Sequence, residues 1–296
     1  MSKQKSDSFK NLFFWFLIII GYISFINIFV IKTTPEFLLI QFAFITTVFL
    51  TSRLKDYAID WIPFIGFFLL YEFLRGFADD LSPFRTLTLL WIYKLEQAIF
   101  GTLPTLSLQQ LFGENKLIIN ISLFFYALFF YYSFLTAFII WIYNRNLFKE
   151  YANKFLLLSI TGLVFFFLIP TAPPWLIEKS ENLGIRRIIY EGNILDNYVI
   201  LTLYNYLFHG NEVAALPSLH SAWPMFTSLF IVKKFKNRFR YLLLIIPLMV
   251  GFSVVLSGEH FILDVLFGFF LAYLVLNIPY GLSWKHLLKF KDIIKT

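Results

Sequence analysis

The chain contains no cysteine, and only 15% of its 296 residues carry a charged side chain. Without cysteine it has no disulfide, no thiol nucleophile and no thiolate metal ligand, so its chemistry must rest on His, Asp, Glu, Ser and the basic residues. It also shows no internal repeat and no low-complexity linker. A single all-helical domain is therefore expected.

Apolar and aromatic residues are in excess. The chain is 59% hydrophobic and 21% aromatic, with 40 phenylalanines and a mean hydropathy of +0.72. No ordinary water-soluble core needs so many large apolar side chains, so the composition predicts a polytopic integral membrane protein. The net charge of +7 comes from basic residues in short segments between apolar runs. That arrangement is typical of a membrane topology signal and speaks against a nucleic-acid partner.

Eight apolar runs are long enough to cross a bilayer, which predicts an all-α transmembrane bundle. The first run follows a lysine-rich start like a signal peptide, but it is long and lacks a small-residue cleavage site, so we interpret it as an uncleaved span. Asp56, Asp60 and Pro63 crowd the junction of the second and third runs. The eight runs cover residues 12–31, 37–52, 58–74, 117–142, 155–170, 215–232, 241–257 and 260–281.

The basic residues predict the sidedness of the bundle. With a cytoplasmic N-terminus, eight spans place 17 of the 25 Lys and Arg residues inside, and the other eight are spread over longer connections. The same arrangement puts His220 and His260 at the outer starts of the sixth and eighth spans. Both histidines therefore reach the non-cytoplasmic face, in what we expect to be the cell membrane. His209 is interpreted as a surface residue, and His286 falls on the opposite side.

Two outer connections, 75–116 and 171–213, are long enough to carry function. In the first, apolar residues recur at helical spacing between Phe84 and Phe100, which predicts a helix in the membrane interface that ends at Gly101 and Pro104. Its apolar positions are Leu87, Leu90, Trp91, Leu95, Ala98 and Ile99, opposed to Arg85, Thr88, Lys94, Glu96 and Gln97. The second connection opens with the segment PTAPPW and carries two adjacent arginines.

The segment PSLH at the start of the sixth span is a candidate anion site. Pro217 suits the first turn of a helix, so the backbone N–H groups of Ser218, Leu219 and His220 are expected to face an anion. The hydroxyl of Ser218 adds a donor, and His220 can give or take a proton beside a bound phosphate. The alternative is a plain helix start with an interfacial histidine.

His260 and Asp264 form the second candidate segment. They are four residues apart, so on a helix both project from one face and the carboxylate orients the imidazole. Such a pair is costly to desolvate at a membrane entrance, which favours a functional interpretation. Polar groups that seal the bundle are the alternative.

Taken together, the segments ALPSLHSAWP and SGEHFILDVLFG resemble the type 2 phosphatidic acid phosphatase superfamily. With the upstream PTAPPW, they are more similar to its branch of inositol phosphorylceramide synthases and related inositolphosphotransferases. The resemblance covers roughly residues 117–281 and implies a six-helix catalytic core. It implies that His260 is the nucleophile, that Asp264 orients it, and that His220 protonates the leaving oxygen and then deprotonates the acceptor. Pro217, Ser218 and Leu219 are implied to bind the phosphate. No metal or other cofactor is expected.

The sequence departs from this family at its two cationic phosphate ligands. Val254 stands where the third motif usually has Arg, and PTAPPW occupies the place of the Lys-containing first motif. Because phosphoryl transfer develops charge on three equatorial oxygens, other cations must replace them. Arg186 and Arg187 are the first candidates, and Trp175 of PTAPPW is expected to line the substrate site. The further candidates are Arg75 and Arg85.

The resulting hypothesis divides the chain into four segments and gives it a membrane lipid as substrate. The leading function is a lipid phosphotransferase that passes a phosphoryl-containing group through a phosphohistidine to an alcohol. A lipid phosphate or polyprenyl diphosphate phosphatase is the close alternative, and a transporter with a proton relay is the alternative of another class. The segments are 1–75 (N-terminal spans), 76–116 (outer interfacial helix), 117–281 (catalytic core) and 282–296 (cytoplasmic tail).

Overall fold

The computed structural model describes residues 53–75, 77, 90–190 and 212–279. Within these residues all regular structure is helical, apart from an isolated β-bridge between Thr171 and Ala214, so the predicted all-α class is confirmed there. The predicted spans 12–31 and 37–52 lie outside the described residues. So do Arg85, His209, His286 and the predicted tail.

The chain divides into two compact units. The first consists of residues 1–77 and 187–211, and the second of residues 78–186 and 212–296. The described helices of the first unit are α3 (Leu54–Arg75) and the short 3-10 helix η2 (Ile188–Tyr190). α3 contains the predicted span 58–74, but it begins earlier than expected.

The early start of α3 corrects the predicted junction between the second and third spans. Asp56 lies in the first helical turn, where the positive end of the helix dipole favours a carboxylate. Asp60 and Pro63 also lie within the helix rather than between two spans. The three residues that were expected to separate two spans are thus all part of one helix.

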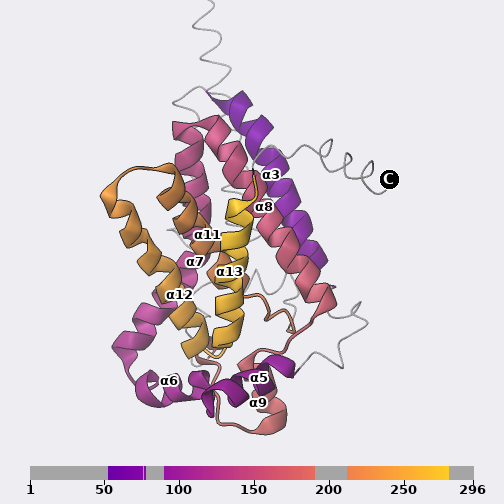
Figure 1. Cartoon of the computed structure of the whole chain (residues 1–296), viewed down its shortest axis with the longest axis vertical. Coiled ribbons are helices and arrows are strands. Elements are labelled where there is room, and N and C mark those ends of the chain that lie inside the picture. The colour runs from indigo at the N-terminus through magenta and orange to yellow at the C-terminus, as the bar shows by residue number, and fades with distance from the viewer. Residues whose placement is uncertain (1–52, 76, 78–89, 191–211, 280–296) are drawn as a thin grey trace, which may run out of the picture. The chain divides into compact units, whose positions relative to one another are not determined.

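Among the described residues of the second unit, five helices form a bundle, in which α11 packs against α7, α12 and α13, and α8 packs against α7, α11 and α13 (Figure 1). Their bounds are α7 Lys116–Tyr143, α8 Arg145–Leu168, α11 Leu219–Lys234, α12 Ile245–Leu256, which follows the 3-10 helix η3 (Arg238–Leu244), and α13 Ile262–Asn277. In the described part of the chain, three helical segments are long and apolar enough to cross a membrane. They are Lys116–Tyr143, Arg145–Leu168 and Arg238–Leu256, so the protein is an integral membrane protein.

Asparagine caps fix where two of these spans begin. The side chain of Asn115 accepts from the N–H groups of Leu117 and Ile118, and α7 starts as predicted. The Asn144 side chain accepts from the N–H groups of Asn146 and Leu147, so α8 starts at Arg145. The predicted start at residue 155 was wrong, because the cap lies in the polar segment before the apolar run.

Three short helices, α5 (Trp91–Phe100), α6 (Pro104–Phe112) and α9 (Pro174–Glu181), gather at one end of this bundle (Figure 1). We call them the cap helices. Gly101, with a φ of 73°, ends α5 as the sequence predicted. Pro104, predicted only to end that helix, also opens α6. The positive φ at Gly101 suits a residue without a Cβ atom.

Glu96, predicted to lie on the polar side of the interfacial helix, lies on the buried face of α5. Leu95 and Ile99, on the apolar face predicted to lie in the membrane interface, are 41% and 56% exposed, whereas Ile92, Tyr93 and Glu96 are buried. Apolar side chains of a membrane protein find a favourable environment in lipid, so helical periodicity alone does not say which face contacts protein. The expected polar position Glu96 is therefore an inward-facing residue.

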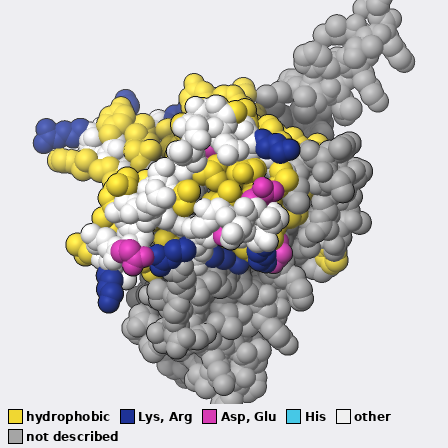
Figure 2. Space-filling view, turned by 90° about the horizontal axis from the view of Figure 1, so that it is seen from below, with side chains coloured by type: hydrophobic (Ala, Val, Ile, Leu, Met, Phe, Trp, Pro, Cys, Tyr) yellow, Lys and Arg dark blue, Asp and Glu magenta, His cyan; other side chains and the backbone are white. Residues whose placement is uncertain are grey.

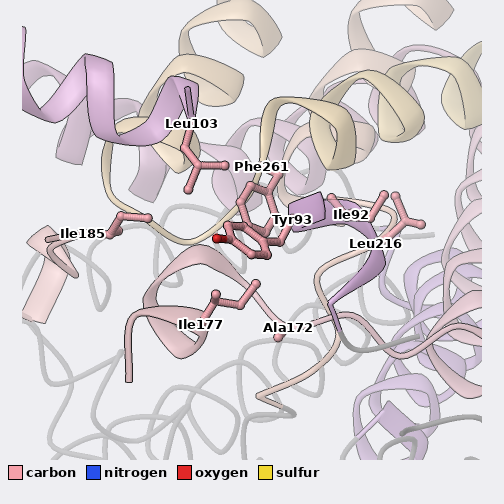
Figure 3. Close-up of a cluster of buried hydrophobic side chains, with 8 residues drawn as sticks. All are labelled: Ile92, Tyr93, Leu103, Ala172, Ile177, Ile185, Leu216 and Phe261. Atoms are coloured by element: carbon pink, nitrogen blue, oxygen red, sulfur yellow. The ribbon is translucent and has the colours of Figure 1, made fainter. Parts of the chain in front are cut away.

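A hydrophobic cluster joins the cap helices to both histidine segments (Figure 3). Its members include Leu216, next to Pro217, and Phe261, next to His260, and both are at most 2% exposed. Burial of each such side chain stabilises the fold by about 1.5–3 kcal/mol. The cluster consists of Ile92, Tyr93, Leu103, Ala172, Ile177, Ile185, Leu216 and Phe261.

Candidate active site

The start of α13 brings His260 and Asp264 together. His260 lies before Phe261, the N-cap residue, and Asp264 lies in the first helical turn. One carboxylate oxygen, Oδ2, accepts from the N–H of Phe261 at 2.9 Å and lies 3.5 Å from Nδ1 of His260. The expectation that both residues lie within a helix is thus corrected. The chain turns at the N-cap, and the carboxylate both caps the helix and faces the imidazole.

His220 faces the same imidazole from α11. Its Nδ1 lies 3.0 Å from Nε2 of His260, within hydrogen-bonding distance, and the two rings meet at 60°. Asp264 is fully buried and His260 is 4% exposed, while His220 is partly exposed. The three side chains named from the sequence therefore lie in one line, in the order Asp264, His260, His220.

The backbone of the PSLH segment is joined directly to α13. The N–H of Ser218 donates to the carbonyl oxygen of Asp264 at 3.0 Å. Gly268 allows this approach, because a Cβ atom there would meet the carbonyl oxygen of Ser218 at 2.5 Å. Ser218 is the N-cap of α11, so Pro217 precedes the helix instead of opening it.

Buried polar atoms collect at this contact. Among the described residues, Oγ of Ser218, Nδ1 of His260 and Oδ1 of Asp264 are buried side-chain atoms with no hydrogen bond. The Nδ1 of His260 is within ion-pair distance of Asp264, but the two groups are not aligned as a hydrogen bond requires. Such atoms are costly to bury unless they acquire a partner, which is typical of a site that binds a polar ligand.

Aromatic side chains from α7 enclose His220. The ring of Tyr126 stacks on it at 5.3 Å between centroids, and Phe129 meets it edge-on at 4.6 Å. The hydroxyl of Tyr126 lies 3.5 Å from Nε2 of His220. Phe129 in turn stacks on Trp223 of α11, whose Nε1 donates to Ser159. Tyr126 could not be identified from the sequence, since nothing in its spacing marks it among so many aromatic residues.

Glu96 is a second residue that sequence reasoning missed. Its side chain is fully buried, and its Oε1 accepts from the N–H of Leu263 in the first turn of α13. Burial raises the pKa of Glu96 to about 7; the backbone N–H groups of Leu263 and Ile262 act in the opposite direction, and the charge of Asp264 adds to the rise. Helix α5 therefore supplies a carboxyl group to the helix that carries Asp264.

Gln109 holds the loop of Arg186 against the end of α12. Its side-chain amide donates to the carbonyl oxygens of Arg186 and Leu256, and its oxygen accepts from the N–H of Arg186. Gly258 lies beside this contact with a φ of 80°, and a Cβ there would meet the carbonyl oxygen of Arg186 at 2.5 Å. The turn before His260 is thereby fixed from outside.

The loop residues named from the sequence have different positions. Trp175 is buried near the site, and its N–H donates to the carbonyl oxygen of Gly258 at 3.1 Å. The guanidinium of Arg186 pairs with Glu114 at 2.5 Å, and both side chains are substantially exposed. Arg187 and Arg75 belong to the first unit, so their predicted contact with phosphate stays a prediction.

The histidines of the candidate site are not seen from the cap end of the molecule (Figure 2). Figure 2, which views the molecule from the cap end, shows hydrophobic, basic and acidic side chains interspersed, and no histidine among the described side chains visible on this face. In the part of the chain that the structure describes, no group of three or more His, Cys, Asp and Glu side chains is arranged to hold a metal ion.

The geometry agrees with a comparison to protein families, in which a sequence model described as the PAP2 superfamily matches residues 90–278. The chain belongs to the PAP2 superfamily. The resemblance noted from the two histidine segments is thus confirmed. The match also includes α5 and α6, which the resemblance had left outside the catalytic core.

Part of the chain is also similar to a curated protein. The phosphoinositol dihydroceramide synthase of Bacteroides thetaiotaomicron is 29% identical over 150 residues, which are 47% of this chain and 48% of the relative. The chain thus matches about half the length of that protein. No solved structure matches this PAP2 chain.

Proposed function

We propose that this PAP2 protein is a membrane enzyme that transfers a phosphoryl-containing group from a lipid phosphoester to an alcohol through a phosphohistidine. The line of Asp264, His260 and His220 carries the proposal. A neutral imidazole can attack phosphorus only if one nitrogen is unprotonated and the other is held by an acceptor. Nδ1 of His260 faces the carboxylate of Asp264, which leaves Nε2 as the attacking atom.

The first step forms a bond between Nε2 of His260 and phosphorus and breaks the bond from phosphorus to the leaving oxygen. His220, charged at the start, gives its Nδ1 proton to that oxygen. In the second step the acceptor hydroxyl gives its proton to Nδ1 of His220 and attacks phosphorus, which releases His260. The 3.0 Å contact between the two imidazoles supports this assignment, because it places the proton donor beside the nucleophile.

Phosphate binding in this proposal falls to Ser218 and to cationic side chains. The buried Oγ of Ser218 gains an acceptor when a phosphate oxygen enters. Arg186 is a suitable cation, because an exposed ion pair such as that with Glu114 contributes only about 0–1 kcal/mol and is easily exchanged. Arg187 and Trp175 complete the proposed substrate site, with Pro217 and Leu219 as its framework.

The curated relative suggests the substrates. Its name states that it makes phosphoinositol dihydroceramide, so we propose that this chain moves a phosphoinositol group from a phospholipid to a ceramide-type hydroxyl. The buried aromatic surroundings of the histidines suit a site from which water is excluded, as transfer requires. Hydrolysis of a lipid phosphate is the alternative outcome, since water then replaces the alcohol. Family membership weighs against the transporter alternative.

The proposed membrane arrangement comprises eight spans with a six-helix core. The site then lies on the non-cytoplasmic face of the cell membrane, where the charge distribution of the sequence puts it. The segments 1–75, 76–116, 117–281 and 282–296 keep their proposed roles as N-terminal spans, interfacial region, catalytic core and tail. No nucleic acid has a part in this function.

The test is a labelling experiment with purified full-length protein and phosphatidylinositol labelled in its phosphate. We expect an acid-labile, base-stable adduct in the wild type, none in His260→Gln, and turnover about 10²–10⁴-fold lower in Asp264→Asn. His286→Gln is the matched control, since His286 is expected on the other side of the membrane. Undiminished turnover in His260→Gln rules out the phosphohistidine.

A second assay separates transfer from hydrolysis. Adding dihydroceramide in increasing amounts should divert label from water-soluble inositol phosphate into a new lipid, because acceptor and water compete for one intermediate. If a panel of ceramide-type and polyol acceptors leaves the hydrolysis rate unchanged and yields no new lipid, the transferase proposal is refuted and the protein is a hydrolase of lipid phosphoesters.

A further inference from the structure

The side chains around His220 give its two ring nitrogens different surroundings. Nδ1 faces Nε2 of His260 at 3.0 Å, and Nε2 faces the hydroxyl of Tyr126 at 3.5 Å. The second distance is at the outer limit of a hydrogen bond, but such contacts are often long before a substrate is bound. Each nitrogen of His220 thus faces a partner suited to its role.

The proposed reaction requires Nδ1 of His220 to carry every proton transfer. When His220 has protonated the leaving oxygen it is neutral, and it can accept a proton at Nδ1 in the next step only if its remaining hydrogen stays on Nε2. That hydrogen needs an acceptor, because an imidazole tautomer is set by the partner of the other nitrogen. The phenolic oxygen of Tyr126 is such an acceptor.

The ring of Tyr126 restrains the same histidine. It stacks on His220 with an angle of 28° between planes, and Phe129, one helical turn further along α7, closes the adjoining side at 64°. An imidazolium is also attracted to the face of an aromatic ring. The hydroxyl and the ring therefore act together on the orientation of His220.

We propose that Tyr126 is a positioning residue for His220, whose phenolic oxygen accepts the Nε2 hydrogen and so presents Nδ1 to the reacting phosphate. It does for His220 what Asp264 does for His260. The proposal rests on the proposed transfer reaction and adds a residue to it.

The experiment compares two donors that carry the same phosphoinositol group. Phosphatidylinositol loses a strongly basic alkoxide, which must be protonated as it leaves, whereas a p-nitrophenyl phosphodiester of inositol loses a weakly basic phenolate that needs no proton. Purified protein is mixed with each donor, and release of the leaving group is followed in a single turnover. In Tyr126→Phe, which keeps the ring, we expect release to be about tenfold slower with phosphatidylinositol and unchanged with the p-nitrophenyl donor.

Tyr132→Phe is the matched control. Tyr132 is also a half-buried tyrosine of α7, and its hydroxyl also contacts an α11 side chain, Ser228, at 2.9 Å. This variant should release both leaving groups at the wild-type rate. His220→Ala should show the same donor dependence as Tyr126→Phe with a larger loss, because it removes the proton donor itself.

The possible outcomes distinguish a failure of the proposed role of Tyr126 from a failure of the phosphohistidine mechanism on which it rests. If His260→Gln releases both leaving groups as fast as the wild type, the phosphohistidine mechanism is refuted. If that variant is inactive but Tyr126→Phe matches the wild type with both donors, only the role of Tyr126 is refuted. An equal loss of rate with both donors in Tyr126→Phe also overturns the role, because it indicates general damage to the site.

Discussion

Glu96 provides a quantitative test of how the cap helix α5 is joined to α13. Its carboxyl group is fully buried and bonded to the N–H of Leu263, and burial raises its pKa from 4.5 to about 7. The folded protein therefore holds this proton more tightly than the unfolded chain. The stability that results is fully present below about pH 4.5 and is lost as the pH rises towards 7. The difference between the two pKa values corresponds to about 3 kcal/mol of unfolding free energy.

The informative variant is Glu96→Gln, because its amide oxygen can still accept from Leu263 but stays neutral at every pH. We expect the free energy of unfolding of this variant, relative to that of the wild type, to rise by about 2.5 kcal/mol as the pH is raised from 5 to 8. In thermal unfolding of detergent-purified protein, the difference in Tm between the two proteins should change by roughly 5–10 °C. Comparing the difference at each pH cancels the other titrating groups.

Gln97→Leu serves as the control, since Gln97 is an exposed neighbour on the same helix. Its difference in Tm from the wild type should be the same at both pH values. The reasoning is refuted if Glu96→Gln also shows a constant difference, because the carboxyl group then titrates alike in the folded and unfolded chains.

Three further changes test other parts of the structure. Gly268→Ala should destabilise the protein by about 1–3 kcal/mol in thermal unfolding and lower turnover, because the new Cβ meets the carbonyl oxygen of Ser218; wild-type turnover contradicts this close contact. Phe261→Ala, which empties a fully buried position of the cluster in Figure 3, should cost about 3–5 kcal/mol by the same measurement. A cysteine at Glu181 should react with an impermeant thiol reagent added outside intact cells, whereas one at Asn237 should not; the reverse labelling would turn the site towards the cytoplasm.

The sequence predicts the core of the site because its groups lie in two short segments. A spacing of four residues was enough to pair His260 with Asp264, although His260 precedes the helix, which begins only after the N-cap residue Phe261. Hydropathy located the described spans, but it could not find the start of α8, since the cap at Asn144 lies in a polar segment.

Contacts between segments that are distant along the chain could not be predicted from the sequence. Glu96 was assigned to the polar face of α5, because periodicity cannot tell a face that contacts lipid from one that contacts protein. The pairing of Arg186 with Glu114 joins residues 72 positions apart and has no local signal. Tyr126 is one of 16 tyrosines, and only the position of α11 beside α7 distinguishes it.

The bond from the N–H of Ser218 to the carbonyl oxygen of Asp264 has an evolutionary consequence. It ties two segments more than forty residues apart into one rigid piece, while the polar turn between α11 and η3 lies at the other end of these helices. Insertions and deletions are therefore expected to accumulate in that turn among related chains, since a change in its length need not disturb the joined ends. A single residue inserted between Ser218 and His220, or between His260 and Asp264, shifts one histidine out of line with the other. Selection should thus preserve the length of each segment more strictly than the distance along the chain between them.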